Sequence, residues 1–536
     1  MGIWKTNKTR LLPEDILSYI TQYEHTEVPR FNTLWQYYQG KNETILGRKA
    51  PSVSSSKSED SFDDTASNKN MPDNKIPIPY GRKIITTFTG YAYRPKYITY
   101  KPIDVEDYTV DGNLENKIPV SEQLSFTEKL DNKQFFVELM KNFRINNEHI
   151  KTSRAGRNTG IFGVSYELLY IDGVMDAKTL NMNAEVKFIT IDPRQMILLY
   201  DYSSEPKKVV AIRYYHVSDN QDIVEVYYAD TIEIYTRELD SGGNWNLKFV
   251  KSAPNFFGEV PVVAYYFGDE MMGLIEPVMP LIDCYDILLS DSMNEFDRFA
   301  NAYLILKKMS LVDPLKRKEP GAFSQALAKL KRYRVFELQD KDSDVKFLMK
   351  DIPFGFIQFM TQFVQKQIHT QSHVPDFAGE KFTGASGIAI QRLLFDFENV
   401  CSDAEADFDV GLYERIRLIS IIYKKLGRAY GDYSAINISH KRNSPLNLQE
   451  FANTASMMKA AGFSRYVIAD IMPDDVIPDV EEELARQDED AMRMMPTVEQ
   501  NQLVNELSKS FAQNPPIDEN QQVVDESLSN GGTLIE

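Results

Sequence analysis

Cysteine is almost absent from this chain: among 536 residues, only Cys284 and Cys401 occur. Two cysteines cannot build the disulfide framework that stabilises small secreted domains, which favours a reducing compartment. Both residues sit in helical patterns among apolar neighbours. We therefore expect two buried free thiols.

Long hydrophobic runs are also missing. No apolar stretch approaches the roughly 18 residues that a membrane-spanning helix needs. The first residues, MGIWKTNKTRLLPED, lack the apolar core of a secretory signal. We expect a soluble, cytosolic chain that makes no contact with a membrane.

Basic residues are outnumbered by acidic ones. Lysine and arginine total 60 against 78 aspartates and glutamates, which gives a formal net charge of −18. A protein that coats nucleic acid neutralises phosphates with basic side chains, so this balance argues against that class. It leaves open a protein through which nucleic acid slides, because strong attraction would hinder sliding.

The remaining composition is that of a globular protein, with 43% hydrophobic and 26% charged residues in a chain long enough for several domains. Helical patterns dominate the first 50 residues and residues 75–155. The serine-rich, charged segment 52–74 cannot bury enough surface to offset its ordering entropy, which predicts a disordered loop. Between 160 and 270, β-branched and aromatic runs predict a meander of short antiparallel strands.

A helical period returns at Pro277. Acidic residues lie off its apolar stripe, which predicts one long amphipathic helix with a solvated acidic face. A basic, strand-containing insert and a second helix from about 353 to 372 follow. The apolar stripe consists of Ile282, Tyr285, Leu289, Met293, Phe296, Ala300 and Tyr303.

The last third of the chain is predicted to be helical. A long apolar stripe covers 388–427, with Gly411 as a candidate kink point. Three short helices follow, and Ser464 is a suitable N-cap for the second of them. The last forty or so residues are polar, and we expect them to be mobile.

One loop, GEKFTGAS at 379–386, comes close to the phosphate-binding pattern G-x-x-x-x-G-K-[ST]. The glycines and Ser386 fit. Ala385, however, stands where the lysine would reach the outer phosphates. A predicted helix rather than a strand precedes the loop, so we do not expect nucleotide hydrolysis here.

A second near match is HTQSH, in which His369 and His373 are four residues apart on a predicted helix. Thr370 replaces the glutamate that would act as general base in a zinc protease. Surface or interface histidines are the better interpretation. The acidic runs at 283–297 and 479–490 are interpreted as solvated helix faces. No catalytic constellation stands out, and we predict neither an enzyme nor a bound cofactor or metal.

The order of these elements resembles the portal proteins of tailed bacteriophages, in the branch typified by a portal from a siphophage of a Gram-positive host. Roughly residues 75–490 carry the resemblance, most specifically 257–306 with its string PVMPLIDCYDILLSDS. The other matching stretches are KIPIPYGRKIITTFTGYAYRPKYITY (75–100), IDPRQMILLYD (191–201) and IHTQSHVPDFAGEKFTGASGIAIQRLL (368–394).

The resemblance implies a mainly helical α+β subunit with a β-rich wing, two long stem helices, a small α/β clip and a helical crown, assembled as a ring. The implied segments are the N-terminal helical part of the wing 1–51, the serine-rich loop 52–74, the wing 75–276, the first stem helix 277–303, the clip 304–352, the second stem helix 353–373, the tunnel loop 374–387, the long kinked helix with its return to the wing 388–446, the crown 447–495 and a flexible tail 496–536.

The resemblance also implies roles for three groups of residues. Glu380, Lys381, Phe382 and Thr383 would meet DNA in the tunnel loop, while Asp283, Asp286 and Asp297 would form an acidic stem face that repels it. The basic clip would dock a partner; as residues alone, it also fits a nucleic-acid patch. Its candidate docking residues are Lys316, Arg317, Lys318, Lys331 and Arg332.

The implied function is a channel for DNA packaging and ejection at one capsid vertex of the virion, assembled in the host cytoplasm from about twelve subunits. The implied partners are double-stranded DNA, the large terminase subunit, a head-completion adaptor, the major capsid protein and its scaffold. Another ring-forming virion connector remains an alternative. A nucleotide-dependent packaging enzyme that uses loop 379–386 is a weaker one.

Overall fold

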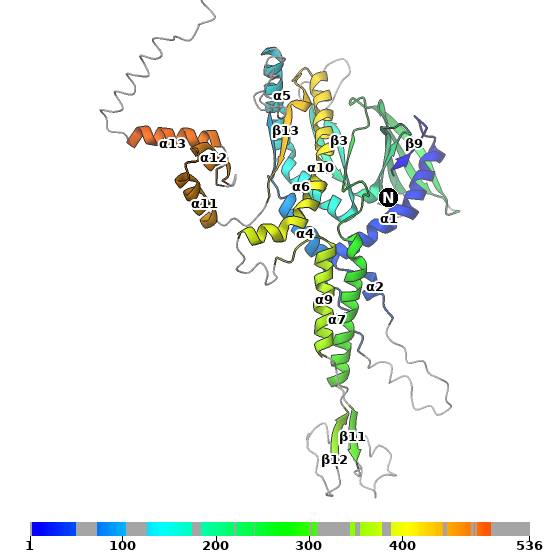
Figure 1. The fold of residues 1–536 in the computed structure, drawn as a ribbon. Coiled ribbons are helices and arrows are strands. Elements are labelled where there is room, and N and C mark those ends of the chain that lie inside the picture. The colour runs from blue at the N-terminus through cyan, green and yellow to red at the C-terminus, as the bar shows by residue number, and fades with distance from the viewer. Residues whose placement is uncertain are drawn as a thin grey trace, which may run out of the picture. The chain divides into compact units, whose positions relative to one another are not determined.

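The computed structural model divides the chain into two units, Met1–Asn443 and Ser444–Glu536. Helices and strands are both abundant, so the fold is of the mixed α+β type (Figure 1). No helix in the described ranges is long and apolar enough to cross a membrane. The structure describes residues 3–49, 72–102, 126–173, 184–218, 221–240, 242–300, 303–307, 344–348, 354–377, 387–442, 448–472, 476–477 and 480–494.

Helices dominate the N-terminal part of the first unit. The first of them begins with Pro13 at its first turn, where the missing N–H is not needed, and ends at Gly40 in a left-handed conformation that favours glycine. The helices of this part are α1 (Pro13–Gln39), α2 (Glu43–Leu46), α4 (Tyr80–Ala92), α5 (Phe126–Asn146) and α6 (Glu148–Phe162).

Two sheets follow, as the β-branched runs predict. The three-stranded sheet has the order β10-β3-β4, and the six-stranded sheet has the order β1-β5-β6-β7-β8-β9. Every pairing is antiparallel except that of β1 with β5, and the consecutive order of β5 to β9 is the predicted meander. The run of β10 departs from it, because β10 pairs with β3 instead of β9. The strands are β1 (Trp4–Lys5), β3 (Val164–Asp172), β4 (Glu185–Ile191), β5 (Met196–Tyr200), β6 (Lys208–Ser218), β7 (Gln221–Tyr227), β8 (Thr231–Leu239), β9 (Trp245–Pro254) and β10 (Val262–Tyr266).

Three long helices complete the first unit. The strands β11 and β12 pair antiparallel and thereby close the segment between α7 and α9. The strand β13 pairs with β2, which returns the chain to the N-terminal part. The elements are β2 (Ile98–Pro102), α7 (Met279–Ala300), β11 (Tyr303–Lys307), β12 (Asp344–Leu348), α9 (Phe354–Gln371), α10 (Gly387–Lys425) and β13 (Ile436–His440).

Gly411 marks the place where α10 packs closely against β10. A Cβ atom at this position would lie 2.5 Å from the ring of Tyr265, too close for any side chain. One turn earlier, Phe408 stacks on the same ring with centroids 4.5 Å apart. Close packing therefore accounts for this glycine, which the sequence alone suggests as a kink point.

A buried ion network fixes α10 to the rest of the unit. Arg415 donates to both carboxylate oxygens of Glu167 on β3, at 2.7 and 2.9 Å. It also donates to Glu148 and Thr152 of α6, at 3.1 and 2.9 Å. Arg415 and Glu167 are completely buried, and such a pair is stable only when its hydrogen bonds are satisfied. One side chain thus ties a helix, a strand and a second helix together.

We expect Arg415→Ala to lower the free energy of unfolding by about 3–5 kcal/mol, because it leaves buried carboxylates without a cation. The matched control is Arg417→Ala on the same helix, whose pair with Glu259 is partly exposed and is expected to contribute about 1 kcal/mol or less. Thermal and urea unfolding of the two purified variants make the comparison. Equal losses in both would contradict the role of the buried network.

The second unit contains the three short helices predicted near the end of the chain: α11 (Leu448–Ala460), α12 (Arg465–Asp470) and α13 (Val480–Met494). Ser464 caps α12 by accepting the N–H of Val467, as predicted. Arg465 of α12 pairs with Asp488 of α13 at 2.9 Å. Among the described residues of this unit, Ala469 is the only buried one.

Candidate functional site: helices α7 and α9

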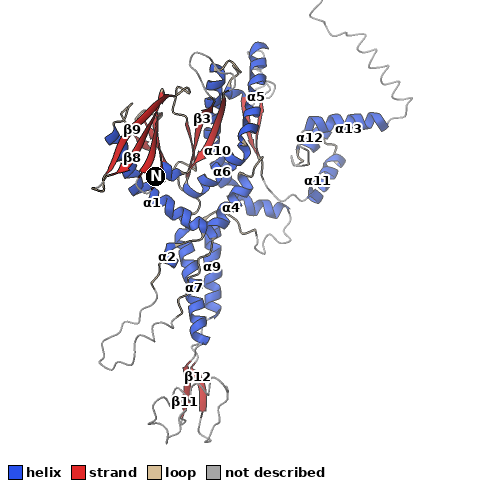
Figure 2. Cartoon of the chain, turned by 180° about the vertical axis from the view of Figure 1, so that it is seen from behind, coloured by secondary structure: helices blue, strands red, loops and turns tan. Residues whose placement is uncertain are grey.

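Helices α7 and α9 lie side by side in both ribbon views (Figures 1 and 2). Phe296 and Phe354 meet with ring centroids 5.7 Å apart. Near the other end, Tyr80 of α4 contacts both Tyr285 of α7 and His369 of α9 through edge-on ring contacts. The pair is thus attached to the rest of the unit through the start of α4.

The face of α7 that is buried is mostly polar. Ile282, Asp286, Ser290 and Asn294 follow one another at intervals of four residues, and all four are buried. An extended segment, residues 74–79 (the strap), lies along this face. Its backbone N–H groups donate in turn to the polar side chains: Ile78 to Asp286 at 2.9 Å, Ile76 to Ser290 at 3.0 Å and Asn74 to Asn294 at 2.7 Å.

The strap sequence NKIPIP accounts for this regular ladder. Four helical residues rise about 6.0 Å, and two residues of extended, polyproline-like chain rise about 6.2 Å, so the donors stay in step with the acceptors. Pro77 and Pro79 have no N–H, and they stand at the alternate positions where no acceptor is offered. A residue that precedes proline is also held extended, which applies to Ile76 and Ile78.

Asp286 is the most constrained member of the ladder. Its carboxylate is fully buried and accepts a second hydrogen bond, from the Asn42 side chain at 2.6 Å. Burial raises the pKa of Asp286 to about 6, while the hydrogen bonds from Ile78 and Asn42 oppose that rise. The prediction that Asp286 belongs to a solvated acidic face is therefore wrong.

Three other acids of α7 contact the N-terminal part of the chain as well. Asp283 accepts from the Tyr37 hydroxyl at 2.7 Å. Asp291 pairs with Arg48 at 2.8 Å, and Asp297, which is exposed, accepts from the Asn74 side chain at 2.6 Å. Each of these acids therefore contacts the chain's own N-terminal part.

The apolar stripe predicted for α7 is only partly buried. Ile282 is covered, but Met293 and Phe296 are exposed. Cys284 is exposed too, against the prediction, whereas Cys401 on α10 is buried as expected. Because the strap supplies backbone donors rather than side chains, it covers the polar face and leaves apolar residues uncovered.

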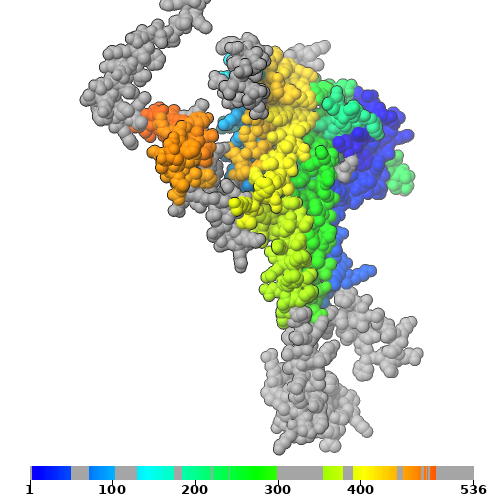
Figure 3. All heavy atoms as spheres, viewed as in Figure 1, coloured from blue at the N-terminus to red at the C-terminus, as the bar shows by residue number. Residues whose placement is uncertain are grey.

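Helix α9 also carries an uncovered aromatic row. Phe356, Phe359 and Phe363 recur at the spacing of one helix face, with exposed fractions of 61%, 60% and 47%. Phe359 and Phe363 stack on each other with centroids 6.0 Å apart. In Figure 3, α7 (green) and α9 (yellow-green) lie at the surface on the side that faces the viewer.

The two histidines of HTQSH do not share a helix face. Helix α9 ends at Gln371, so His373 lies beyond it, in a left-handed conformation with φ of 55°. The Nδ1 of His369 lies 2.9 Å from the carbonyl oxygen of Val374, and burial lowers the pKa of His369. In the described ranges, no group of three or more histidine, cysteine or acidic residues could hold a metal ion.

Two groups of predicted site residues lie outside the described residues. They are Glu380, Lys381, Phe382 and Thr383 of the loop, and Lys316, Arg317, Lys318, Lys331 and Arg332 of the basic insert. The loop follows the end of helix α9, and Asp376 just before it pairs with Lys83 of α4 at 2.8 Å. A P-loop follows a strand, whereas this loop follows a helix.

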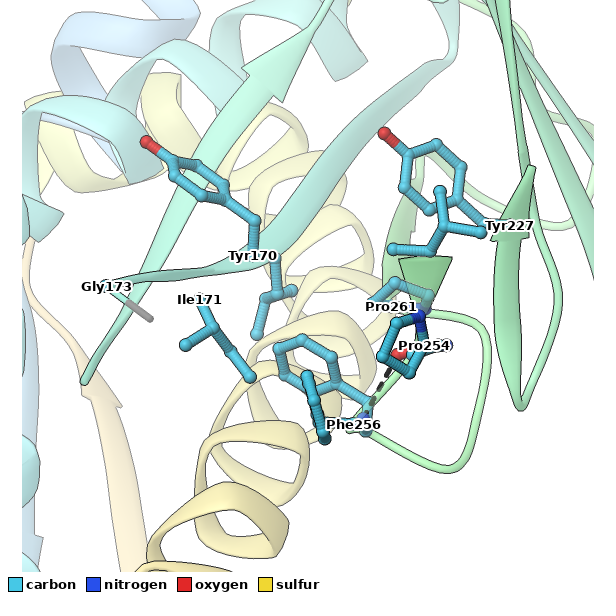
Figure 4. Close-up of a pocket in the computed structure, with 11 residues that line it drawn as sticks. Tyr170, Ile171, Gly173, Tyr227, Pro254, Phe256 and Pro261 are labelled. Atoms are coloured by element: carbon cyan, nitrogen blue, oxygen red, sulfur yellow. Dashed lines mark hydrogen bonds between the residues drawn. The ribbon is translucent and has the colours of Figure 1, made fainter. Parts of the chain in front are cut away.

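A cavity of about 190 Å³ lies between the two sheets. Figure 4 shows Ile171 of β3 on one side of it and Tyr227 with Pro254 and Pro261 on the other. Its lining carries no charged side chain, and its volume is below the range of about 300–1,000 Å³ that is usual for small-molecule sites. This cavity does not suggest a nucleotide or cofactor site.

We expect Asp286→Ala to lower the free energy of unfolding by about 1–3 kcal/mol, because it leaves the Ile78 N–H and the Asn42 amide buried without an acceptor. Asp286→Asn is the matched variant. Its new amide can still accept from Ile78, and Asn42 can turn to offer its Oδ1, which has no partner among the described residues. Hydrogen exchange at Ile76 and Ile78 should accelerate in the alanine variant and stay slow in the asparagine variant.

The same pair of proteins gives a test of pH dependence. A folded pKa of about 6, above the ordinary value of 3.8, means that the stability contributed by the protonated acid is present below about pH 4 and is lost as the pH rises through 6. The side chain of Asp286→Asn cannot ionise. The melting temperature of this variant minus that of the wild type should therefore increase between about pH 4.5 and pH 7. A constant difference across this range would show that Asp286 keeps an ordinary pKa.

Comparison with known proteins bears directly on this arrangement. The family model described as "Phage portal protein, SPP1 Gp6-like" matches residues 17–495. The portal protein of Bacillus phage SPP1 is 21% identical over 323 residues, which covers 57% of this chain and 62% of that protein. The match with that relative thus spans less than two thirds of its length. Because the family model covers most of the chain, from α1 to the end of α13, this protein belongs to the SPP1 Gp6-like family of phage portal proteins.

Proposed function

We propose that this chain is the portal subunit of a tailed bacteriophage, and that copies of it form a ring at one capsid vertex through which DNA is packaged and ejected. The observation that carries the proposal is the family match over 17–495. In this proposal, α7 and α9 are the stem, the sheets and their helices are the wing, the segment that β11 and β12 close is the clip, and α11–α13 are the crown.

Ring assembly is supported by the aromatic row on α9. Phe356, Phe359 and Phe363 form a contiguous apolar stripe on a helix that has no cover on that side among the described residues. Large exposed apolar patches of soluble proteins usually mark interaction sites. A ring of identical subunits would cover this stripe with a different face of the neighbouring copy.

We expect the double variant Phe356→Ser/Phe359→Ser to form far fewer rings than the wild type, because each buried aromatic side chain removes about 150–250 Å² from water. Native mass spectrometry with negative-stain electron microscopy would count the subunits. Val217→Ser, a change at an exposed apolar position of β6, is the control and should leave the rings intact. Full-sized rings in the double variant would exclude this stripe as a subunit contact.

The path of DNA is the second part of the proposal. We propose that Glu380, Lys381, Phe382 and Thr383 project into the channel and meet DNA. The support is the family resemblance and the position of the loop between α9 and α10. The net charge of −18 suits a channel whose wall does not hold the phosphates of passing DNA. Asp297 is exposed and remains a candidate for that wall.

Lys381→Ala should leave ring assembly unchanged and lower the amount of DNA retained in filled particles severalfold, because it removes one cation per subunit from the DNA contact. DNase-protected DNA per particle is the measurement. Lys133→Ala, at an exposed position of α5, is the control. Normal retention in the Lys381 variant would exclude this side chain as a DNA contact while leaving the ring untouched.

Partner docking completes the proposal. The basic insert, through Lys316, Arg317, Lys318, Lys331 and Arg332, would dock the large terminase subunit during packaging and a head-completion adaptor afterwards. The wing would contact the major capsid protein and its scaffold. The role is structural and needs no cofactor. Its place is the portal vertex of the virion, with assembly in the host cytoplasm.

A further inference from the structure

Strand β9 is an open edge of the six-stranded sheet. It pairs with β8 over its whole length of ten residues, and within the described part of the chain no strand pairs with its other side. Figures 1 and 2 show it at the outer side of the sheet. An edge of this length presents a row of unpaired N–H and C=O groups, which proteins usually shorten or cover.

The second half of β9 is largely left exposed by the described residues. Trp245 and Leu247, near its start, are half-buried, whereas every residue from Lys248 to Pro254 is exposed. The exposed fractions of Phe249 and Val250 reach 54% and 53%. The Phe249 ring contacts the Tyr235 ring of β8 with centroids 5.6 Å apart, yet about half of the surface of Phe249 and of Val250 stays exposed.

The charged residues of β9 are all basic. Its sequence WNLKFVKSAP contains Lys248 and Lys251 and no acid, in a chain whose net charge is −18. The residues opposite these lysines on β8 are Thr236 and Ile234, which carry no charge. Neither lysine forms an ion pair with any described residue. Among the described residues, these two cations therefore lie unpaired along an open hydrogen-bonding edge.

We propose that residues 248–254 of β9 are a docking edge for an extended, acidic segment of another protein, which adds to the sheet as a further strand. The main-chain groups of the edge would supply the hydrogen bonds of β-augmentation. Lys248 and Lys251 would select carboxylates, and Phe249 and Val250 would contact apolar side chains of the incoming strand.

The same features argue against a second copy of β9 as the occupant. Antiparallel pairing of two β9 edges would bring lysines of both strands close together, and like charges opposite each other destabilise a sheet. The register shift between Ile234 and Tyr235 places a bulge at Val250, which further limits pairing with an arbitrary strand. The lysines and the bulge thus disfavour pairing with another β9 or with an arbitrary strand, and they favour pairing with an acidic strand.

The test uses the full-length protein and two fluorescent peptides, Thr-Val-Glu-Val-Glu-Val-Glu-Val-Thr and its counterpart with lysine in place of each glutamate. Fluorescence anisotropy measures binding at low salt. We expect the acidic peptide to bind and the basic one to bind at least about tenfold more weakly. In the basic peptide, lysines replace the glutamates that would pair with Lys248 and Lys251, so two attractive pairs become repulsive. Hydrogen exchange should slow at alternate amides of residues 248–253 when the acidic peptide is added.

Charge reversal on the protein gives the sharper result. Lys248→Glu/Lys251→Glu should invert the preference between the two peptides, whereas Lys133→Glu/Lys424→Glu, at exposed positions of α5 and α10, should leave it unchanged. No binding of the acidic peptide, or an equal response in both double variants, overturns the proposal. A change of subunit number in the β9 variant alone, without peptide binding, would instead assign this edge to contacts between copies. None of these measurements needs DNA or a capsid, so failure here leaves the proposed portal role standing.

Discussion

The need to pair backbone N–H groups decides which side of α7 is buried. The strap places three N–H groups, those of Asn74, Ile76 and Ile78, against the helix, and each donor requires an acceptor once water is excluded. Asp286, Ser290 and Asn294 are those acceptors. Their spacing of four residues matches two residues of extended chain, so the polar side of α7 packs inward. The apolar residues of the same helix are left for the outside.

This inversion shapes the surface of the helix pair. With the strap on one side of α7, Met293 and Phe296 stay exposed beside the phenylalanines of α9. A monomer gains nothing from such a surface, whereas a ring of copies can bury it. The buried ladder therefore accounts for the exposed Met293 and Phe296 of α7, which lie on the helix that pairs with α9. In the proposed ring, the strap would fix the rotation of α7 within each subunit and so determine which side chains meet the neighbour.

Local sequence patterns are sufficient to predict the helices, the antiparallel order of β5 to β9 and the N-cap at Ser464. They fail on the faces of α7, since a side-chain pattern carries no information about backbone donors delivered from the strap more than 200 residues earlier in the chain. The alternation of proline in NKIPIP was the available signal. Cys284 was misplaced for the same reason, and His373 because the helix ends two residues before it. The ion network of Arg415 joins residues far apart in sequence and has no local motif.

The two polar sites of the subunit differ in how their charge is satisfied. Arg415 holds its carboxylates with a full positive charge in a dry core, an arrangement that tolerates no change of partner. The ladder on α7 uses backbone N–H groups and an amide in place of a cation, so the buried carboxylate of Asp286 has a raised pKa of about 6. A wing that must stay rigid benefits from the first arrangement. The helix pair, by contrast, is held through a carboxylate whose pKa of about 6 makes its contribution to stability depend on pH.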